Sequence, residues 1–182
     1  QTIVARSWLL ANIEQKHRHL GFDICNDDCC QRYQGMGNCS EASIKSAEAT
    51  FGKVIMFEDK ICDARYSKSC GGITENFENV WEGDPVPYLI SVEDVDSKGT
   101  AFCSPDIVPE ESLKSFIGNV DEKGQYFRWT FEPTQDELIR SLKNKHKIEA
   151  TEILQLTPEK IGNSGRIINL RIDYKDIQNN LR

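Results

Sequence analysis

The sequence predicts an α+β fold, in which helices and short antiparallel strands form a main lobe and a smaller second lobe follows. Three observations support this prediction. Apolar residues near the start recur at helical spacing, short alternating runs are bounded by turn residues, and a polar tract at 94–109 is interrupted by glycine and proline. With 182 residues the chain can hold one large or two small domains. We expect the main lobe at residues 1–105 and the second lobe at 106–182.

The main lobe begins with an amphipathic helix, because apolar residues between positions 3 and 11 recur every three or four residues. A second helix is expected at 40–50, where Ser40 can cap the first turn and Gly52 follows the end. Two strands should follow at 54–57 and 61–66, joined by a polar turn at 58–60. Further strands are expected at 90–92 and 126–131.

The second lobe should contain one helix and a hairpin. Thr134 is a typical N-cap, followed by acidic residues in the first turn and apolar residues up to Asn144. Two strands at 148–157 and 166–174 are separated by the turn residues 162–165.

Composition excludes some partners. The net charge is −7 and the basic residues are scattered, which argues against nucleic acid or an anionic membrane surface. No apolar run is long enough to span a bilayer. The chain opens at Gln1 in what reads as the middle of a helix, so we expect a fragment or a processed product of a longer protein.

Three of the seven cysteines crowd together and predict a metal site. Cys25, Cys29 and Cys30 follow closely after His19, and zinc prefers four thiolate and imidazole ligands in a tetrahedral array. One of the two histidines, His17 or His19, completes the ligand set; we favour His19 and predict a structural zinc on His19, Cys25, Cys29 and Cys30. The alternative is that the cysteines form a disulfide or stay free, since an odd number cannot all pair within one chain.

A polar loop at 66–76 is bracketed by hydrophobic runs. Gly71 and Gly72 allow positive φ and close approach of a ligand to the backbone, and Ser69, Thr74 and Glu75 supply polar groups beside them. This suits a neutral polar ligand such as a sugar. The alternative is a tight turn in which these side chains satisfy the loop backbone.

Several stretches together resemble the stage II sporulation protein D family, which also includes amidase-enhancer proteins. The opening residues 1–8 resemble the family helix that reads roughly QAVAARTY, and the CCQRYQG run at 29–35 resembles its cysteine-bearing loop. The residues of the 66–74 run match the YxxSxGGxT signature. The resemblance covers most of the chain, strongly up to Val92 and more weakly beyond.

The resemblance implies a peptidoglycan lytic transglycosylase that acts on denuded glycan strands outside the cytoplasm, membrane-anchored or secreted in its full length. The family's catalytic glutamate would lie upstream of Gln1, and its role is not assigned to Glu75 or Glu78. Zinc in the cysteine loop is also implied. The residues expected to line the glycan groove or hold its loops are Arg6, Gln31, Tyr33, Ser69, Gly71, Gly72, Thr74 and Glu75.

Other functions stay open at this point. The chain can be a non-catalytic glycan-binding module that recruits or stimulates a cell-wall amidase, or a zinc-stabilised structural domain. Catalysis by Cys70 with a base such as His146, or by the Glu75 and Glu78 carboxylates, has no supporting motif. Cys70 stands where the family commonly has serine, which suggests pairing with Cys62 or Cys103.

Overall fold

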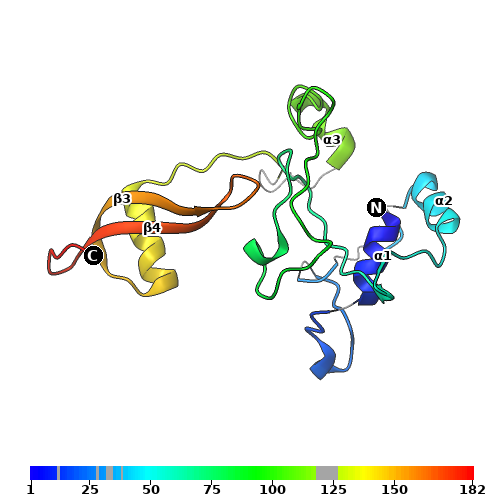
Figure 1. Ribbon diagram of the computed structural model, residues 1–182, viewed down its shortest axis with the longest axis horizontal. Coiled ribbons are helices and arrows are strands. Elements are labelled where there is room, and N and C mark those ends of the chain that lie inside the picture. The colour runs from blue at the N-terminus through cyan, green and yellow to red at the C-terminus, as the bar shows by residue number, and fades with distance from the viewer. Residues whose placement is uncertain (12, 28, 32–34, 38, 118–126) are drawn as a thin grey trace. The chain divides into compact units, whose positions relative to one another are not determined.

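The computed structural model describes residues 1–11, 13–27, 29–31, 35–37, 39–117 and 127–182 (Figure 1). Its helices and small antiparallel sheets confirm the predicted α+β class. The chain forms two compact units, Gln1–Ser67 and Lys68–Arg182, and each is described by itself. The lobe boundary expected near residue 105 falls inside the second unit.

In the first unit, helix α1 (Thr2–Ala11) is tied to the segment that follows the second helix. Ser7 is completely buried, and its hydroxyl donates to the Ile3 carbonyl and accepts from the Ile55 N–H at 2.9 Å. Arg6 donates to the carbonyls of Thr50 and Lys53. Two neighbouring polar side chains therefore fix the helix against residues almost fifty positions later.

A Ser7→Ala variant should lose about 1–3 kcal/mol of unfolding free energy, because it removes the completely buried hydroxyl that bonds the Ile3 carbonyl and the Ile55 N–H. Urea unfolding of the whole chain measures this loss. Ser46→Ala is the matched control, since the Ser46 hydroxyl also donates to a carbonyl four residues earlier but is exposed. Equal stability of the two variants would contradict the expected role of Ser7.

Helix α2 (Glu41–Ala49) begins as predicted, because the Ser40 side chain accepts the N–H of Ser43. The hairpin predicted after it also forms, with shorter strands: β1 (Met56–Phe57) pairs antiparallel with β2 (Lys60–Ile61). Glu58 and Asp59 both have positive φ, as a two-residue hairpin turn of type I′ requires.

The second unit begins with an irregular region rather than a sheet. The predicted strand at 90–92 is wrong: Ile73 and Glu93 form one isolated bridge, and the Thr74 N–H donates to the Val92 carbonyl. The short 3₁₀ helix η2 (Phe77–Asn79) buries Phe77, whose ring stacks on Trp81. Helix α3 (Glu110–Ile117) follows.

The strand predicted at 126–131 is also wrong over its described residues, 127–131. Arg128 explains the difference. Its guanidinium donates to the carbonyls of Cys103 and Val108 and pairs with Glu110, so this segment is held by a side chain and not by a backbone ladder.

The end of the chain matches the predicted helix and hairpin closely. Helix α4 (Gln135–Ser141) starts with a full capping box between Thr134 and Glu137, and it continues into a π-helical turn, η3 (Leu142–His146). Strand β3 (Ala150–Ile161) pairs antiparallel with β4 (Ile167–Asp176), and α4 packs against β3 (Figure 1).

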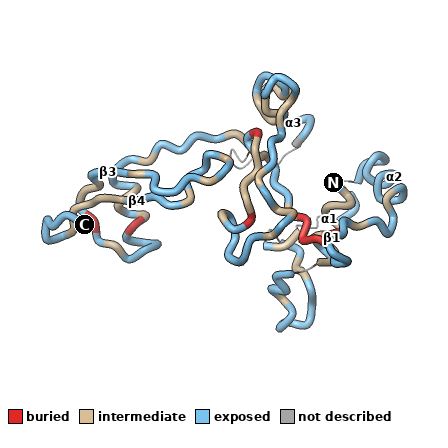
Figure 2. The backbone as a smooth tube through the Cα atoms, in the orientation of Figure 1, coloured by how far each residue is buried: buried red, intermediate tan, exposed pale blue. Residues whose placement is uncertain are grey.

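Among the described residues, deeply buried apolar side chains are spread in small groups along the chain (Figure 2). Cys62 and Ala64 lie after β2, Phe77 in η2, Leu113 in α3, Leu142 in η3, and Ala150 at the start of β3. Because these groups are small, hydrogen bonds made by polar side chains such as Ser7 and Arg128 are important in holding the segments of each unit in place. Within the described part of the chain, no helix combines the length and hydrophobicity needed to cross a membrane.

Candidate functional site

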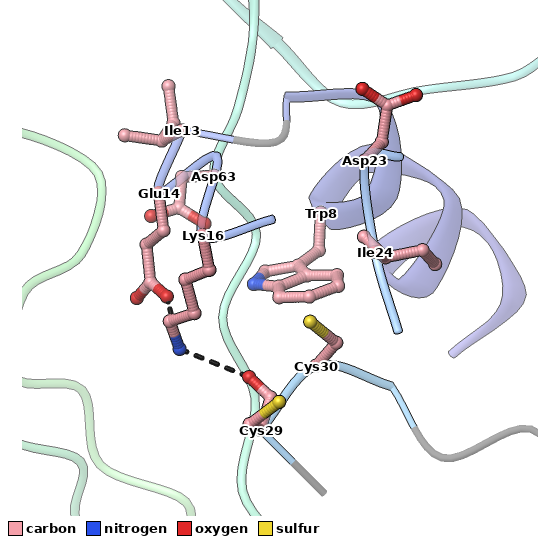
Figure 3. Close-up of a pocket in the computed structure, with 9 residues that line it drawn as sticks. All are labelled: Trp8, Ile13, Glu14, Lys16, Asp23, Ile24, Cys29, Cys30 and Asp63. Atoms are coloured by element: carbon pink, nitrogen blue, oxygen red, sulfur yellow. Dashed lines mark hydrogen bonds and ion pairs between the residues drawn. The ribbon is translucent and has the colours of Figure 1, made fainter. Parts of the chain in front are cut away.

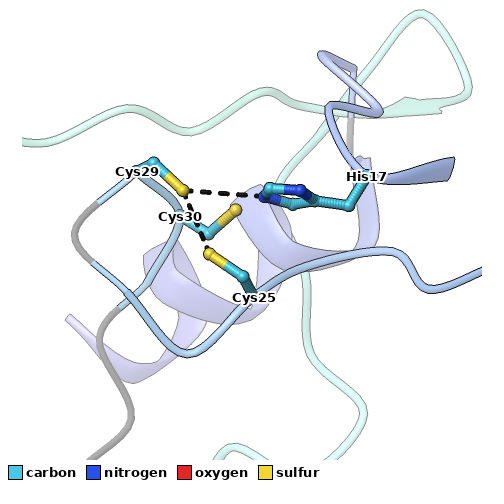
Figure 4. Close-up of side chains that lie close together, drawn as sticks. All are labelled: His17, Cys25, Cys29 and Cys30. Carbon is cyan, nitrogen blue, oxygen red and sulfur yellow. Dashed lines mark hydrogen bonds between the residues drawn. The ribbon is translucent and has the colours of Figure 1, made fainter. Parts of the chain in front are cut away.

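Four metal-ligating side chains meet in the first unit. The ring of His17 and the thiols of Cys25, Cys29 and Cys30 point toward one another, and their ligand atoms all lie within 4.8 Å of each other (Figure 4). The sulfur of Cys29 is 3.0 Å from that of Cys25 and 3.6 Å from Nε2 of His17. The three predicted cysteines are thus brought together.

The histidine in this cluster is His17, whereas the sequence analysis selected His19. The residues Arg18–Leu20 form a short 3₁₀ helix, η1, with His17 as its N-cap. Side chains two positions apart in such a helix point in different directions, so only one of the two histidines can face the cysteines. His17 also stacks on Phe22, with ring centres 5.1 Å apart, whereas His19 is exposed.

The cluster fits one metal ion by its donor types and its size. Four bonds of about 2.1–2.3 Å in a tetrahedron place the ligand atoms about 3.5–3.8 Å apart, close to the spacing in this structure. A hydrogen bond between Cys25 and Cys29 raises the pKa of Cys29 to about 12 and lowers the pKa of Cys25. The two sulfurs therefore share a proton that a metal ion would displace.

A shallow pocket lies beside the cluster (Figure 3). Trp8 from α1 lines it together with Cys29 and Cys30, and Lys16 donates to the Cys29 carbonyl at 3.1 Å. Glu14 pairs with Lys16 and with Arg65, and Arg65 also binds Asp63. This chain of ion pairs connects the cysteine loop to the end of the first unit. The complete lining is Trp8, Ile13, Glu14, Lys16, Asp23, Ile24, Cys29, Cys30 and Asp63.

The remaining predicted residues of the first unit hold loops or cannot be placed. The Arg6 guanidinium binds the carbonyls after α2, as described above, and the Gln31 amide donates weakly to the Ala5 carbonyl at 3.4 Å. Tyr33 lies outside the described residues. Contact of these side chains with a glycan stays a prediction.

In the second unit, the predicted residues Ser69–Thr74 form a compact loop, called the signature loop below. The hydroxyl of Thr74 donates to the Ile90 carbonyl and accepts from the Val92 N–H. Gly72 is buried, with φ +93°, and a Cβ there would lie 2.8 Å from the Cβ of Ala101. Gly71 is exposed, with φ +67°. Thr74 and Gly72 thus act as the loop supports that the sequence analysis left open as an alternative.

Glu75 is the most strongly held carboxylate of this region. It accepts from the hydroxyl and the N–H of Ser164, from the Asn79 amide at 2.9 Å, and from the Asn76 N–H at 2.9 Å. Burial alone would raise the pKa of Glu75, but these hydrogen bonds, the one from the Ser164 side chain foremost, outweigh it and lower the pKa to about 2. Glu75 is therefore ionised at neutral pH and cannot serve there as a general acid.

The hairpin turn completes this arrangement. Gly162 lies against the Glu75 carboxylate so closely that a Cβ would be 2.1 Å from Oε2. Arg166 donates to the carbonyls of Cys70 and Ile73 in the signature loop. The contacts of Ser164 and Arg166 with Glu75, Cys70 and Ile73 are called the latch below. It holds the signature loop to the tip of the β3–β4 hairpin.

The sequence did not predict the roles of Ser164 and Arg166. Ser164 and Arg166 lie in or beside a predicted turn, where serine and arginine are ordinary residues. The available signal was Glu75 itself, a carboxylate between apolar runs without a nearby basic residue in the sequence. Such a group needs donors from elsewhere in the fold.

Comparisons with known proteins match the two ends of the chain to different families. Residues 75–182 match the family described as Domain of unknown function (DUF8618), and residues 1–57 match the family described as Stage II sporulation protein. The sporulation match therefore stops before the signature loop, although the sequence resemblance was expected to extend to Val92 and, more weakly, beyond. No solved structure matches the chain.

Two curated relatives are similar to the chain. An uncharacterized protein of Brachyspira hyodysenteriae is 26% identical over 177 residues, which is 97% of this chain and 41% of the relative. The amidase enhancer of Bacillus subtilis is 33% identical over 94 residues, 52% of this chain and 12% of that protein. The chain thus spans less than half the length of either relative. Through residues 75–182 it belongs to the DUF8618 family, and its first 57 residues are similar to the stage II sporulation protein family.

Proposed function

We propose that this chain is a zinc-stabilised, glycan-binding part of a protein that works on bacterial peptidoglycan outside the cytoplasm. The observation that carries the proposal is the similarity to the Bacillus subtilis amidase enhancer, together with the match of residues 1–57 to the sporulation family. The donor set of His17, Cys25, Cys29 and Cys30 supports zinc, because three thiolates and one imidazole form a closed structural site.

The charge state of the carboxylates favours binding over cleavage by this chain. A lytic transglycosylase acid must be protonated near neutral pH, which requires a raised pKa. In the described part of the chain, four carboxyl groups have a pKa that clearly departs from the ordinary value, and in each of them the pKa is lowered. These groups are Glu14, Glu75, Glu137 and Asp176. We therefore propose that any glycan cleavage by the longer protein uses an acid other than Glu75.

The proposed contact surface is the exposed side of the signature loop. Thr74 and Glu75 are already engaged within the protein, whereas Gly71 is exposed and lets a sugar ring approach the backbone. In the first unit, the Tyr66 side chain has 53% of its surface exposed, and its ring can stack on a sugar face. Arg6, Gln31 and Tyr33 are proposed as glycan contacts of the first unit by itself, as the family resemblance implies.

The first test is cosedimentation of the chain with peptidoglycan whose stem peptides have been removed. Tyr66→Ala should weaken binding about tenfold, the loss of one stacking contact. Phe51→Ala is the matched control, because Phe51 is an aromatic residue with 87% exposure at the end of α2. Wild-type protein that stays in the supernatant would overturn glycan binding.

The second test is mass spectrometry of the glycan after incubation with the chain or with its full-length protein. We expect no cleavage products from the chain alone. Anhydromuramic ends from the full-length protein would show a lytic transglycosylase with its acid outside this chain. An unchanged glycan, together with faster release of stem peptides when a cell-wall amidase is added, would support the non-catalytic enhancer. Anhydro products from the chain itself would contradict the role given to Glu75.

A further inference from the structure

One arginine of the second unit binds the signature loop with part of its guanidinium group. Arg166 directly precedes β4 at the tip of the hairpin, and it is exposed. Its Nη1 donates to the Ile73 carbonyl at 3.0 Å, and its Nη2 donates to the Cys70 carbonyl at 2.5 Å. A Cβ at Gly71 would lie 3.5 Å from the same Nη2 atom. The guanidinium therefore lies beside the exposed glycine where we propose that a sugar approaches the loop.

Among the described residues, no carboxylate forms an ion pair with Arg166. Both atoms that accept from its side chain are neutral carbonyl oxygens. The carboxylates bonded to this region have other donors: Glu75 accepts the four hydrogen bonds given above, and Asp94 accepts from the Cys70 thiol at 3.3 Å. Three other arginines of the second unit do pair with carboxylates, namely Arg128 with Glu110, Arg171 with Glu159 and Asp173, and Arg182 with Asp176.

The guanidinium of Arg166 keeps three N–H groups for a ligand. An arginine side chain carries five N–H donors in a rigid planar arrangement, and the loop carbonyls use two of them. The Nε–H is among the three that bond to no described residue. Together with an N–H of the neighbouring Nη atom, it forms an edge that can bind a carboxylate through two parallel hydrogen bonds. Because the loop carbonyls already fix the side chain, binding costs less conformational entropy.

We infer that Arg166 is a carboxylate-binding residue, and that its ligand is the lactyl carboxylate of muramic acid in the glycan strand. The inference rests on the proposed glycan function and deepens it. Of the two sugars that alternate in peptidoglycan, only muramic acid carries a lactyl group. The stem peptide is joined to that group through an amide bond, which removes the negative charge. Arg166 thus distinguishes muramic acid from glucosamine, and a free lactyl group from one that carries a peptide.

The experiment is cosedimentation of the whole chain with two preparations of peptide-free glycan strands. In the first preparation the lactyl carboxylates are free. In the second they are converted to methyl amides, which removes the charge and leaves the sugar rings unchanged. We expect the wild-type chain to bind the free carboxylates about tenfold more tightly at low salt, the effect of one charge-assisted contact. High salt should reduce this ratio, because it screens exposed charges.

The ratio between the two preparations is the readout for variants, because a weakened loop would lower both affinities alike. Arg166→Gln should bind the two preparations equally well. Arg171→Gln is the matched control, since it removes another exposed arginine from the same unit. Arg171 already pairs with Glu159 and Asp173, so its variant should keep the ratio of the wild type.

Competition with small molecules tests the inference on the wild-type chain without any substitution. N-acetylmuramic acid should displace the free-carboxylate strands at a lower concentration than its methyl ester does. D-lactate carries the same carboxylate without the sugar, so it should compete less well than N-acetylmuramic acid. Equal competition by D-lactate would overturn the assignment to muramic acid, and equal competition by the methyl ester would overturn binding of the carboxylate.

The outcomes separate this inference from the proposed function. Equal binding of the wild-type chain to both preparations would overturn the role of Arg166 and leave glycan binding intact. An unchanged ratio in Arg166→Gln would also overturn it, because another group would then bind the carboxylate. A wild-type chain that binds neither preparation would overturn the proposed function and this inference with it.

Discussion

A Cys25→Ser variant is expected to lose its metal and to unfold its first unit at a markedly lower temperature than the wild-type chain. The cluster connects His17, at the start of η1, to the cysteine loop at 25–30, and a bound ion would connect all four side chains at once. Removing one of four ligands should weaken metal binding by about a thousandfold, which corresponds to about 4 kcal/mol of lost stabilisation at a fixed metal concentration.

Metal content by elemental mass spectrometry and thermal unfolding by circular dichroism measure this effect. Cys39→Ser is the matched control, because Cys39 is an exposed cysteine outside the cluster. A second pair separates the two histidines: His17→Ala should reduce metal content, whereas His19→Ala should not. Unchanged metal content and stability in Cys25→Ser would refute the metal assignment, and loss of metal only in His19→Ala would restore the ligand set chosen from the sequence.

The second large effect is expected at the latch. Gly162→Ala should release the signature loop, because its new Cβ would occupy the position of the Glu75 carboxylate, 2.1 Å from Oε2. Charge-assisted hydrogen bonds are worth about 1.5–3 kcal/mol each, and Glu75 makes two to Ser164. We expect about 2 kcal/mol of destabilisation, together with faster hydrogen exchange in residues 69–75.

Gly37→Ala is the control for this substitution, because a Cβ at Gly37 meets nothing within 4 Å. Glu75→Gln should destabilise the chain by a similar amount. The double variant should be little worse than either single variant, since both remove the same contact. Full additivity, or unchanged exchange rates in the loop, would show that the latch does not hold it.

The latch should also make stability depend on pH in a defined window. The pKa of Glu75 is about 2 in the folded protein and 4.5 for an ordinary glutamate, so the unfolded state binds the proton more tightly. Its stabilisation is complete above about pH 4.5 and is lost as the pH falls toward 2. The difference in unfolding free energy between wild type and Glu75→Gln should therefore shrink over this range and stay constant between pH 6 and 8.

Local signals in the sequence predicted the local structure well. Ser40 and Thr134 cap their helices as expected, because each cap involves residues only three positions apart. The turn at Glu58 and Asp59 is likewise encoded by its own residues. The cysteine cluster could be predicted because metal ligands share a recognisable chemistry and spacing.

Contacts between distant segments could not be predicted from these local sequence signals. The choice between His17 and His19 depends on the direction of a short helical turn, which the sequence does not specify. The segment around Arg128 has the alternation of a strand but is held by side-chain hydrogen bonds to carbonyls of the 103–108 segment. Ser164, which donates twice to Glu75, lies 89 residues away in a turn whose sequence looks ordinary.

That separation has a consequence for the order of folding. The β3–β4 hairpin pairs neighbouring segments and can form within about 1–10 μs. The contact between Glu75 and Ser164 must close a far longer loop, at a greater entropic cost. We therefore expect the hairpin to be present early and the signature loop to gain its final shape among the last steps, with stopped-flow mixing separating the two. Newly made chains would pass through a stage in which the hairpin is folded but Arg166 does not yet bind the carbonyls of Cys70 and Ile73.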